Sequence, residues 1–106
     1  MLNIKFSAQS INDLKEIKQY ISLELFNEAS AVKLINKIMD CIRNLGEFPF
    51  LGSPLSSKIN LETDYRFIVC HKYIVFYRTD TDNLYIVRIL SSRRNCIKIL
   101  FDISND

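Results

Sequence analysis

The sequence predicts an α+β fold with the element order β-α-α-β-β-β, in which a helix hairpin packs on one face of a small, mostly antiparallel sheet. Two observations lead to this prediction. In the first half, two consecutive segments repeat apolar residues at three- and four-residue spacing, the period of a helix that packs along one side. The second half holds three short runs rich in β-branched and aromatic residues, separated by turn sequences.

The length and composition favour one compact core. The chain has 106 residues, of which 48% are hydrophobic and 25% charged, with only two Gly and two Pro. That length is too short for two ordinary domains, and the composition is typical of a folded protein rather than a disordered one. We therefore expect a single domain over residues 1–106.

The sequence has neither a secretory nor a membrane-spanning pattern. No apolar run approaches the roughly 18 residues of a membrane helix, and no basic region precedes an apolar stretch at the N-terminus. Cys41, Cys70 and Cys96 lack metal-ligand spacing and lie in apolar patterns, where cysteine acts as a small hydrophobe. We expect a cytoplasmic protein with reduced, structural cysteines and with no metal or cofactor.

The first expected elements are a strand over residues 2–6 and a helix over about residues 8–25. Apolar residues alternate with polar ones in the strand, as they do when one face is buried. Ser7 or Ser10 can cap the N-terminus of the helix, since a serine oxygen accepts an otherwise unpaired backbone N–H. The expected core stripe of the helix is Ile11, Leu14, Ile17, Ile21 and Leu25.

A second helix is expected over about residues 28–45. Asn27 separates it from the first, and Gly46 and then Pro49 are expected to end it. Two amphipathic helices joined by a few residues pack as an antiparallel hairpin, which needs a sheet to cover its apolar side. The expected core stripe of this helix is Val32, Ile35, Met39, Ile42 and Leu45.

The rest of the chain reads as a loop followed by three strands. "GSPLSS", residues 52–57, has loop composition, and strands are expected at about 65–70, 73–79 and 84–90. The short connections, His71-Lys72 and "DTDN", predict an antiparallel meander. Its runs are apolar on both faces, so the face opposite the helices needs a cover. We favour a partner protein there over the short C-terminal run "CIKILF".

Positive charge is concentrated in the second half of the chain, although the net charge is only +2. Between residues 66 and 98, Asp80 and Asp82 are outnumbered by cationic residues. Such a patch attracts phosphate-bearing or acidic partners. The cationic residues are Arg66, Lys72, Arg78, Arg88, Arg93, Arg94 and Lys98.

Three motifs in this order give the chain a family resemblance. They are "FPFLGSPL" after the second helix, "YRFIVCHKYIVFYRTDTDNLYIVRIL" over the meander, and the closing "SSRRNCIKILF". With the β-α-α-β-β-β order, the chain resembles the RelE/ParE superfamily of type II toxin–antitoxin toxins over nearly its whole length. The resemblance implies a small toxin that arrests growth and that a cognate antitoxin neutralises in a hetero-oligomeric complex.

The resemblance leaves two targets open. RelE-like members cleave messenger RNA on the ribosome without a metal, whereas ParE-like members poison DNA gyrase by binding. Metal-free cleavage needs cations on the scissile phosphate and groups that exchange protons. The resemblance assigns the cationic role to Arg66, Arg93 and Arg94, and His71 is the remaining candidate if the protein is a ribonuclease. Arg78 and Arg88 are expected to be structural, paired with Asp80, Asp82 or Glu62.

The proton-exchanging positions argue for gyrase. Many members carry His or Tyr at the position of Ser91, and RNA-cleaving members often have one in the following segment, where this chain has Asn95, Cys96 and Ile97. A gyrase inhibitor is therefore ranked first and a ribosome-dependent endoribonuclease second. A plain nucleic-acid-binding domain is third, because the chain lacks the paired sheet aromatics and the helix-turn-helix signature of such modules.

Overall fold

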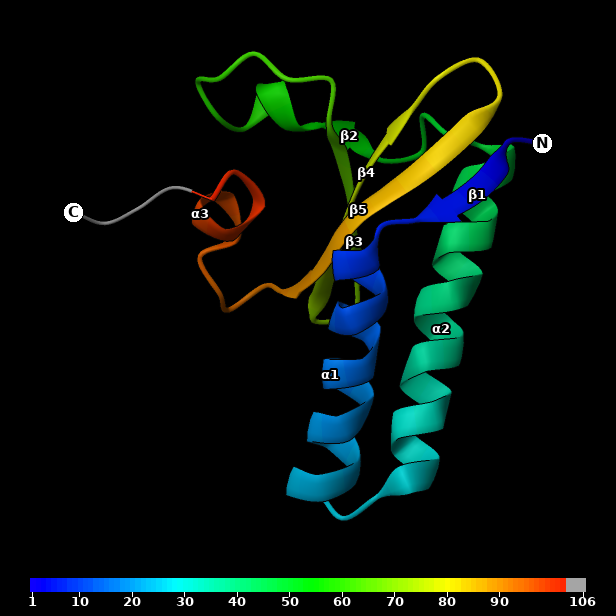
Figure 1. Cartoon of the computed structure of the whole chain (residues 1–106), viewed down its shortest axis with the longest axis vertical. Coiled ribbons are helices and arrows are strands. Elements are labelled where there is room, and N and C mark those ends of the chain that lie inside the picture. The colour runs from blue at the N-terminus through cyan, green and yellow to red at the C-terminus, as the bar shows by residue number, and fades with distance from the viewer. Residues whose placement is uncertain (103–106) are drawn as a thin grey trace.

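The computed structural model describes residues 1–102, which form a five-stranded sheet between a helix hairpin and a short C-terminal helix (Figure 1). The predicted α+β class and the helix hairpin on one sheet face are confirmed. The elements in chain order are β1 (Asn3–Phe6), α1 (Ala8–Glu24), α2 (Glu28–Glu47), β2 (Ser53–Pro54), the 3-10 helix η1 (Leu55–Ser57), β3 (Arg66–Cys70), β4 (Tyr73–Thr79), β5 (Asn83–Ser91) and α3 (Cys96–Leu100).

The sheet has the strand order β1-β5-β4-β3-β2. Strands β3, β4 and β5 form the predicted antiparallel meander, while β1 joins β5 in parallel. The segment predicted to be loop contains β2 and η1, so that prediction was wrong in part. Because Pro54 has no backbone N–H, it is tolerated at the outer edge of the sheet, where it pairs with Arg66.

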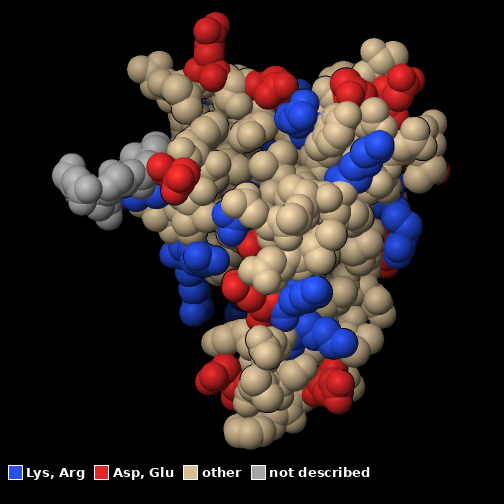
Figure 2. All heavy atoms as spheres, in the orientation of Figure 1, with Lys and Arg blue, Asp and Glu red and all other residues tan. Residues whose placement is uncertain are grey.

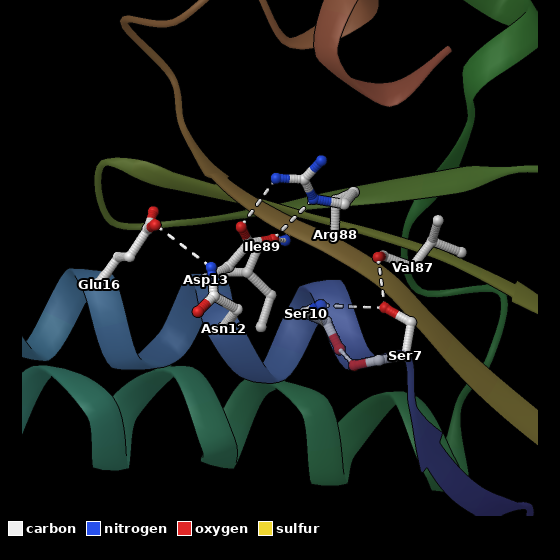
Figure 3. Close-up of polar contacts among 8 residues, drawn as sticks. All are labelled: Ser7, Ser10, Asn12, Asp13, Glu16, Val87, Arg88 and Ile89. Carbon is white, nitrogen blue, oxygen red and sulfur yellow. Dashed lines mark hydrogen bonds and ion pairs between the residues drawn. The ribbon is translucent and has the colours of Figure 1, made fainter. Parts of the chain in front are cut away.

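Helix α1 starts at the predicted Ser7 cap and is fastened there to β5. The Ser7 Oγ accepts the Ser10 N–H at 3.0 Å and donates to the carbonyl of Val87 at 2.7 Å (Figure 3). Two positions of the predicted core stripe are wrong, because Ile11 is 44% exposed and Leu25 58% exposed. The buried side of α1 instead includes Ser10 and Asp13. Because both are polar, the spacing of apolar residues did not indicate that they are buried.

Helix α2 does not end at Gly46, as the sequence predicted, but continues to Glu47. Its last turn closes with a hydrogen bond from the Phe48 N–H to the Asn44 carbonyl at 2.8 Å. Gly46 lies under the N-terminal strand, and a Cβ there would be 3.2 Å from the Cδ1 of Ile4. The glycine therefore admits a close neighbour rather than terminating the helix.

Two apolar clusters lie on opposite faces of the sheet. The larger one joins α1 and α2 to the sheet, and its buried residues are Ile17, Ile38, Ile42, Leu45, Cys70, Val75, Tyr77, Leu84, Ile86 and Ile89. The smaller one lies beneath η1 and α3, and its buried residues are Leu55, Phe76, Leu90 and Cys96. The second face, which the sequence analysis assigned to a partner, is therefore covered in part by the chain's own C-terminal run. Tyr65 and Phe101 stack there with ring centroids 5.7 Å apart.

Candidate functional site

Arg66, the first candidate, is engaged by the loop that follows α2. Its Nη2 donates to the Gly52 carbonyl at 2.7 Å and more weakly to the Phe50 carbonyl at 3.5 Å. The guanidinium carbon lies 5.0 Å from the centre of the Phe50 ring, within cation–π range. Its Nε is buried and makes no hydrogen bond within residues 1–102. Arg66 therefore holds the "FPFLGSP" loop against β3.

Tyr77 fastens the same loop from the neighbouring strand. Its buried hydroxyl accepts the Gly52 N–H at 3.1 Å and donates to the Pro49 carbonyl at 2.8 Å. A Cβ on Gly52 would stand 2.5 Å from both this hydroxyl and the Phe67 carbonyl, so only glycine fits. The glycine of the "FPFLGSPL" motif is therefore required by the close contact of this loop with β3 and β4.

The other three candidates lie at the opposite end of the meander. His71 occupies the β3–β4 turn with φ 58°, and Arg93 and Arg94 follow β5. The Ser92 N–H donates to the Lys72 carbonyl at 2.8 Å, so the two connections are adjacent. Strand β3 lies between them and Arg66, and it is about 13 Å long from Arg66 to Cys70 at about 3.3 Å per residue. The structure therefore does not gather all four candidates around one phosphate.

A basic pocket adjoins His71 at this end. Its cavity volume is about 370 Å³, and an apolar floor is bordered by cationic side chains from α2 and from the β3–β4 turn. Burial raises the pKa of Tyr73, so that its hydroxyl remains a neutral hydrogen-bond donor. The residues lining the pocket are Ile21, Ser30, Lys33, Leu34, Lys37, His71, Lys72 and Tyr73.

Sequence reasoning missed the contribution of α2 to this pocket. Lys33 and Lys37 lie four residues apart and therefore share a helix face, which is a readable signal. It was missed because positive and negative residues are balanced in the first half of the chain, and only the fold brings this face beside Lys72. The face visible in Figure 2 has Lys and Arg side chains across its middle, and acidic side chains lie among them, along the upper rim and near the lower tip.

Arg94 borders hollows on both faces of the sheet. One, of about 220 Å³, lies between α1 and the sheet and also contains Asp13, Glu16 and Tyr73. The other, of about 350 Å³, is apolar and lies between η1 and α3. Both Arg93 and Arg94 are exposed, and neither forms an ion pair with any of the described residues. They are free to meet an acidic or phosphate-bearing partner.

Arg88 is structural, as predicted, but its partner is Asp13 of α1 rather than a nearby acid. Two N–H···O contacts of 2.9 Å join the guanidinium to the carboxylate, which also accepts the Ile89 N–H at 2.9 Å (Figure 3). The hydrogen bonds to Asp13 raise the pKa of Arg88, which keeps the guanidinium charged. Arg78 lies over the Tyr85 ring, 4.5 Å from its centre, and forms no ion pair with an acid within residues 1–102.

The described residues include no group of three or more His, Cys, Asp or Glu side chains placed to hold a metal ion. Likewise, none of the helices within residues 1–102 has the length and apolar character needed to span a membrane. Both statements concern the described part of the chain alone.

Comparison with known proteins places this arrangement in a family. Residues 4–96 match the family model described as the ParE toxin of the type II toxin–antitoxin system parDE. A solved structure, the chromosomal ParDE toxin–antitoxin system of P. aeruginosa, is 19% identical, with a TM-score of 0.69 over 86% of this chain and 96% of that one. That likeness shows a shared fold. No curated protein matches the chain significantly. The chain therefore belongs to the ParE toxin family of type II toxin–antitoxin systems, whose toxins are neutralised by a cognate ParD antitoxin.

Proposed function

We propose that this toxin arrests growth by binding DNA gyrase, the typical target of ParE toxins, and that it does not cleave RNA. The observation that carries the proposal is that Arg66 is bound to the loop after α2. The Nη2 of Arg66 donates to the Gly52 carbonyl, the guanidinium carbon lies over the Phe50 ring and the Nε is buried. The group is thus turned toward the loop, whereas a phosphate-stabilising arginine needs its donors directed at the reacting oxygen.

The surroundings of Arg66 support the same proposal. Its recorded contacts within residues 1–102 are backbone carbonyls and a phenyl ring, none of which exchanges protons near neutral pH. His71, the only histidine, lies beyond the other end of β3. Cations without an adjacent acid and base suit binding rather than RNA cleavage.

A second candidate function is the ribosome-dependent endoribonuclease. The observation that favours it is the adjacency of the β3–β4 turn and the connection after β5, which brings His71, Arg93 and Arg94 to one end of the sheet. Arginines can hold phosphate oxygens, and histidine can exchange a proton at neutral pH. In that case the catalytic residues would be His71, Arg93 and Arg94, with Arg66 supporting the loop.

A supercoiling assay and a message-cleavage assay on the parent toxin and on Arg66→Ala separate the two functions. For a gyrase inhibitor, we expect purified toxin to inhibit supercoiling, the variant to lose less than about tenfold in potency, and cellular messages to remain intact. For a ribonuclease, messages would be cut and supercoiling would be unchanged. Arg66→Ala would then lower the cleavage rate by about 2 to 3 powers of ten if Arg66 stabilised the transition state, and by much less if it only supports the loop while His71, Arg93 and Arg94 are catalytic. A supercoiling assay and primer extension on messages measure both arms, and added ParD antitoxin is the control that should restore supercoiling.

The gyrase proposal is contradicted by one clear result: cuts at ribosomal A sites in cells expressing the toxin, together with unchanged supercoiling in its presence. A folded toxin that shows neither activity would also contradict the proposal, because the proposal requires purified toxin to inhibit supercoiling.

Reversing the charge of Arg93 and Arg94 tests the basic end of the sheet. We expect Arg93→Glu with Arg94→Glu to weaken inhibition of supercoiling at least tenfold, because like charges across an interface are strongly unfavourable. The matched control, Lys5→Glu with Lys15→Glu, makes the same change in net charge at exposed positions on β1 and α1. Equal losses in the two double variants would show that net charge alone matters and not this surface.

We further propose that residues 1–106 form one toxin domain, which acts in the cytoplasm and is held by ParD in a hetero-oligomeric complex. The apolar hollow between η1 and α3 suits an antitoxin segment with Leu or Ile on one side and Asp or Glu on the other. Its floor includes Phe67 and Ile74, and Lys58 and Arg94 line it as well. An acidic amphipathic segment could therefore satisfy both the apolar surface and the cations.

A further inference from the structure

Two cysteines from distant parts of the chain meet in the larger core. Cys41 lies on α2 and Cys70 ends β3, and their Sγ atoms are 2.9 Å apart, joined by a weak thiol hydrogen bond. Both are free thiols. A disulfide S–S bond is about 2.05 Å long, so the sulfurs need approach by only about 0.9 Å to be bonded.

Regular structure on both sides keeps the two thiols together. Cys70 lies opposite Tyr73 in the β3–β4 ladder, and its Sγ also contacts the Lys37 carbonyl at 3.8 Å, one turn before Cys41 on α2. Cys70 is 3% exposed, whereas Cys41 is partly exposed. The Cys41 thiol can therefore react with a small oxidant from solvent, and the buried Cys70 thiol lies next to it.

We propose that Cys41 and Cys70 form an oxidative modification site that a peroxide converts to an intramolecular disulfide. The Cys41 sulfur attacks the peroxide O–O bond, giving a sulfenic acid and one water from hydrogen peroxide. The Cys70 sulfur then displaces the sulfenic oxygen, which leaves as a second water. Two thiols lose two electrons and two protons while one peroxide is reduced to two waters.

The environment of Cys70 makes it the resolving thiol. Burial, reinforced by the hydrogen bond to Cys41, raises the pKa of Cys70 to about 12. A thiol that ionises so poorly is a weak first nucleophile, so the partly exposed Cys41 reacts first. The site is consequently reduced under ordinary cytosolic conditions and oxidised only when peroxide is supplied, which is how redox-responsive cytosolic disulfides behave.

The expected consequence is a more stable toxin whose helix α2 is bonded to the sheet. The two cysteines are 29 residues apart, so the bond closes a loop of that size in the unfolded chain. Restricting such a loop raises the melting temperature of a domain of this size by on the order of 10 °C. The bond would also fix α2 beside the basic pocket, where Lys37 and Tyr73 lie. This inference does not depend on whether gyrase is the target.

Trypsin digestion provides a direct test, because each cysteine falls in a different peptide: 38–43, 67–72 and 95–98. The full chain is reduced, freed of reductant, treated with hydrogen peroxide, alkylated under denaturing conditions and digested. We expect a cross-linked pair of peptides 38–43 and 67–72, with Cys96 alkylated. Burial also raises the pKa of Cys96, and no other cysteine is recorded in contact with it, so it is the internal control.

Variants make the result decisive. Cys96→Ser should retain both the cross-link and the rise in melting temperature on oxidation, while Cys41→Ser and Cys70→Ser should lose both. If the buried Cys70→Ser variant does not fold, Cys41→Ser still provides the test, since its thiol is partly exposed. The proposal is overturned if all three cysteines remain alkylated after peroxide treatment, if the dominant product is a disulfide between two chains, or if Cys96 is oxidised first.

Discussion

Replacing Asp13 by Ala is expected to lower the free energy of unfolding by about 3 kcal/mol, because it leaves a largely buried guanidinium without its counter-charge. The side chain of Asp13 is 3% exposed and that of Arg88 16% exposed. The same carboxylate accepts the N–H of the buried Ile89, which would also lose its partner. We expect the melting temperature to fall by roughly 10–20 °C in a thermal unfolding experiment.

A surface ion pair in the same protein is the matched control. Asp40 and Arg43 lie one turn apart on α2, and their side chains are 66% and 57% exposed. Asp40→Ala should change the free energy of unfolding by less than about 0.5 kcal/mol, because water and salt screen exposed pairs. Equal effects at Asp13 and Asp40 would show that burial does not make the Asp13–Arg88 pair more important to stability than the exposed Asp40–Arg43 pair.

Gly52→Ala is expected to destabilise the protein by about 2–3 kcal/mol. The new Cβ would be 2.5 Å from the Tyr77 hydroxyl and from the Phe67 carbonyl, which belongs to β3 and cannot move alone. Relieving the overlap requires breaking the hydrogen bond from Gly52 to Tyr77 or displacing the loop that Arg66 holds. Chemical denaturation of the purified variant measures the loss.

The second glycine of the chain provides the comparison. At Gly46 an added Cβ would meet the flexible ends of Ile4 and Met1 at 3.2 and 3.3 Å. A helical glycine replaced by alanine gains up to about 1 kcal/mol from propensity, which offsets this crowding. Gly46→Ala should therefore remain within about 1 kcal/mol of the parent protein. A Gly52→Ala variant as stable as Gly46→Ala would show that the loop is not fixed as described.

The position of the Gly52 loop also bears on function. Arg66 holds this loop in place and is not a free cationic site. Variants of Arg66 or Gly52 should therefore lower toxicity in proportion to the loss of folded protein. Arg93 and Arg94 differ, since their side chains are exposed and variants there can alter partner binding without unfolding. Comparing toxicity with folded protein across these variants separates the two ends of the sheet.

The sequence by itself determined the type and order of the main elements. The helical period of the first half and the apolar runs of the second predicted α1, α2 and the meander, with the ends of β4 at Tyr73 and Thr79. Patterns of this kind are local, because the 3.6- and 2-residue periods record which side of a helix or strand is buried. The ordered loop, meander and Arg-Arg motifs likewise indicate the family from the sequence alone.

The tertiary structure alone decided which polar residues meet across the fold. Asp13 and Arg88 lie 75 positions apart, and no periodicity links them, so the sequence paired Arg88 with nearby acids instead. In the same way, the contact of Cys41 with Cys70 and the separation of Arg66 from Arg93 depend on how α2 and β5 lie against β3 and β4. Apolar burial follows local patterns because it is non-directional, whereas ion pairs, thiol contacts and shared cationic sites require specific atoms to be brought within a few ångströms, which only packing achieves.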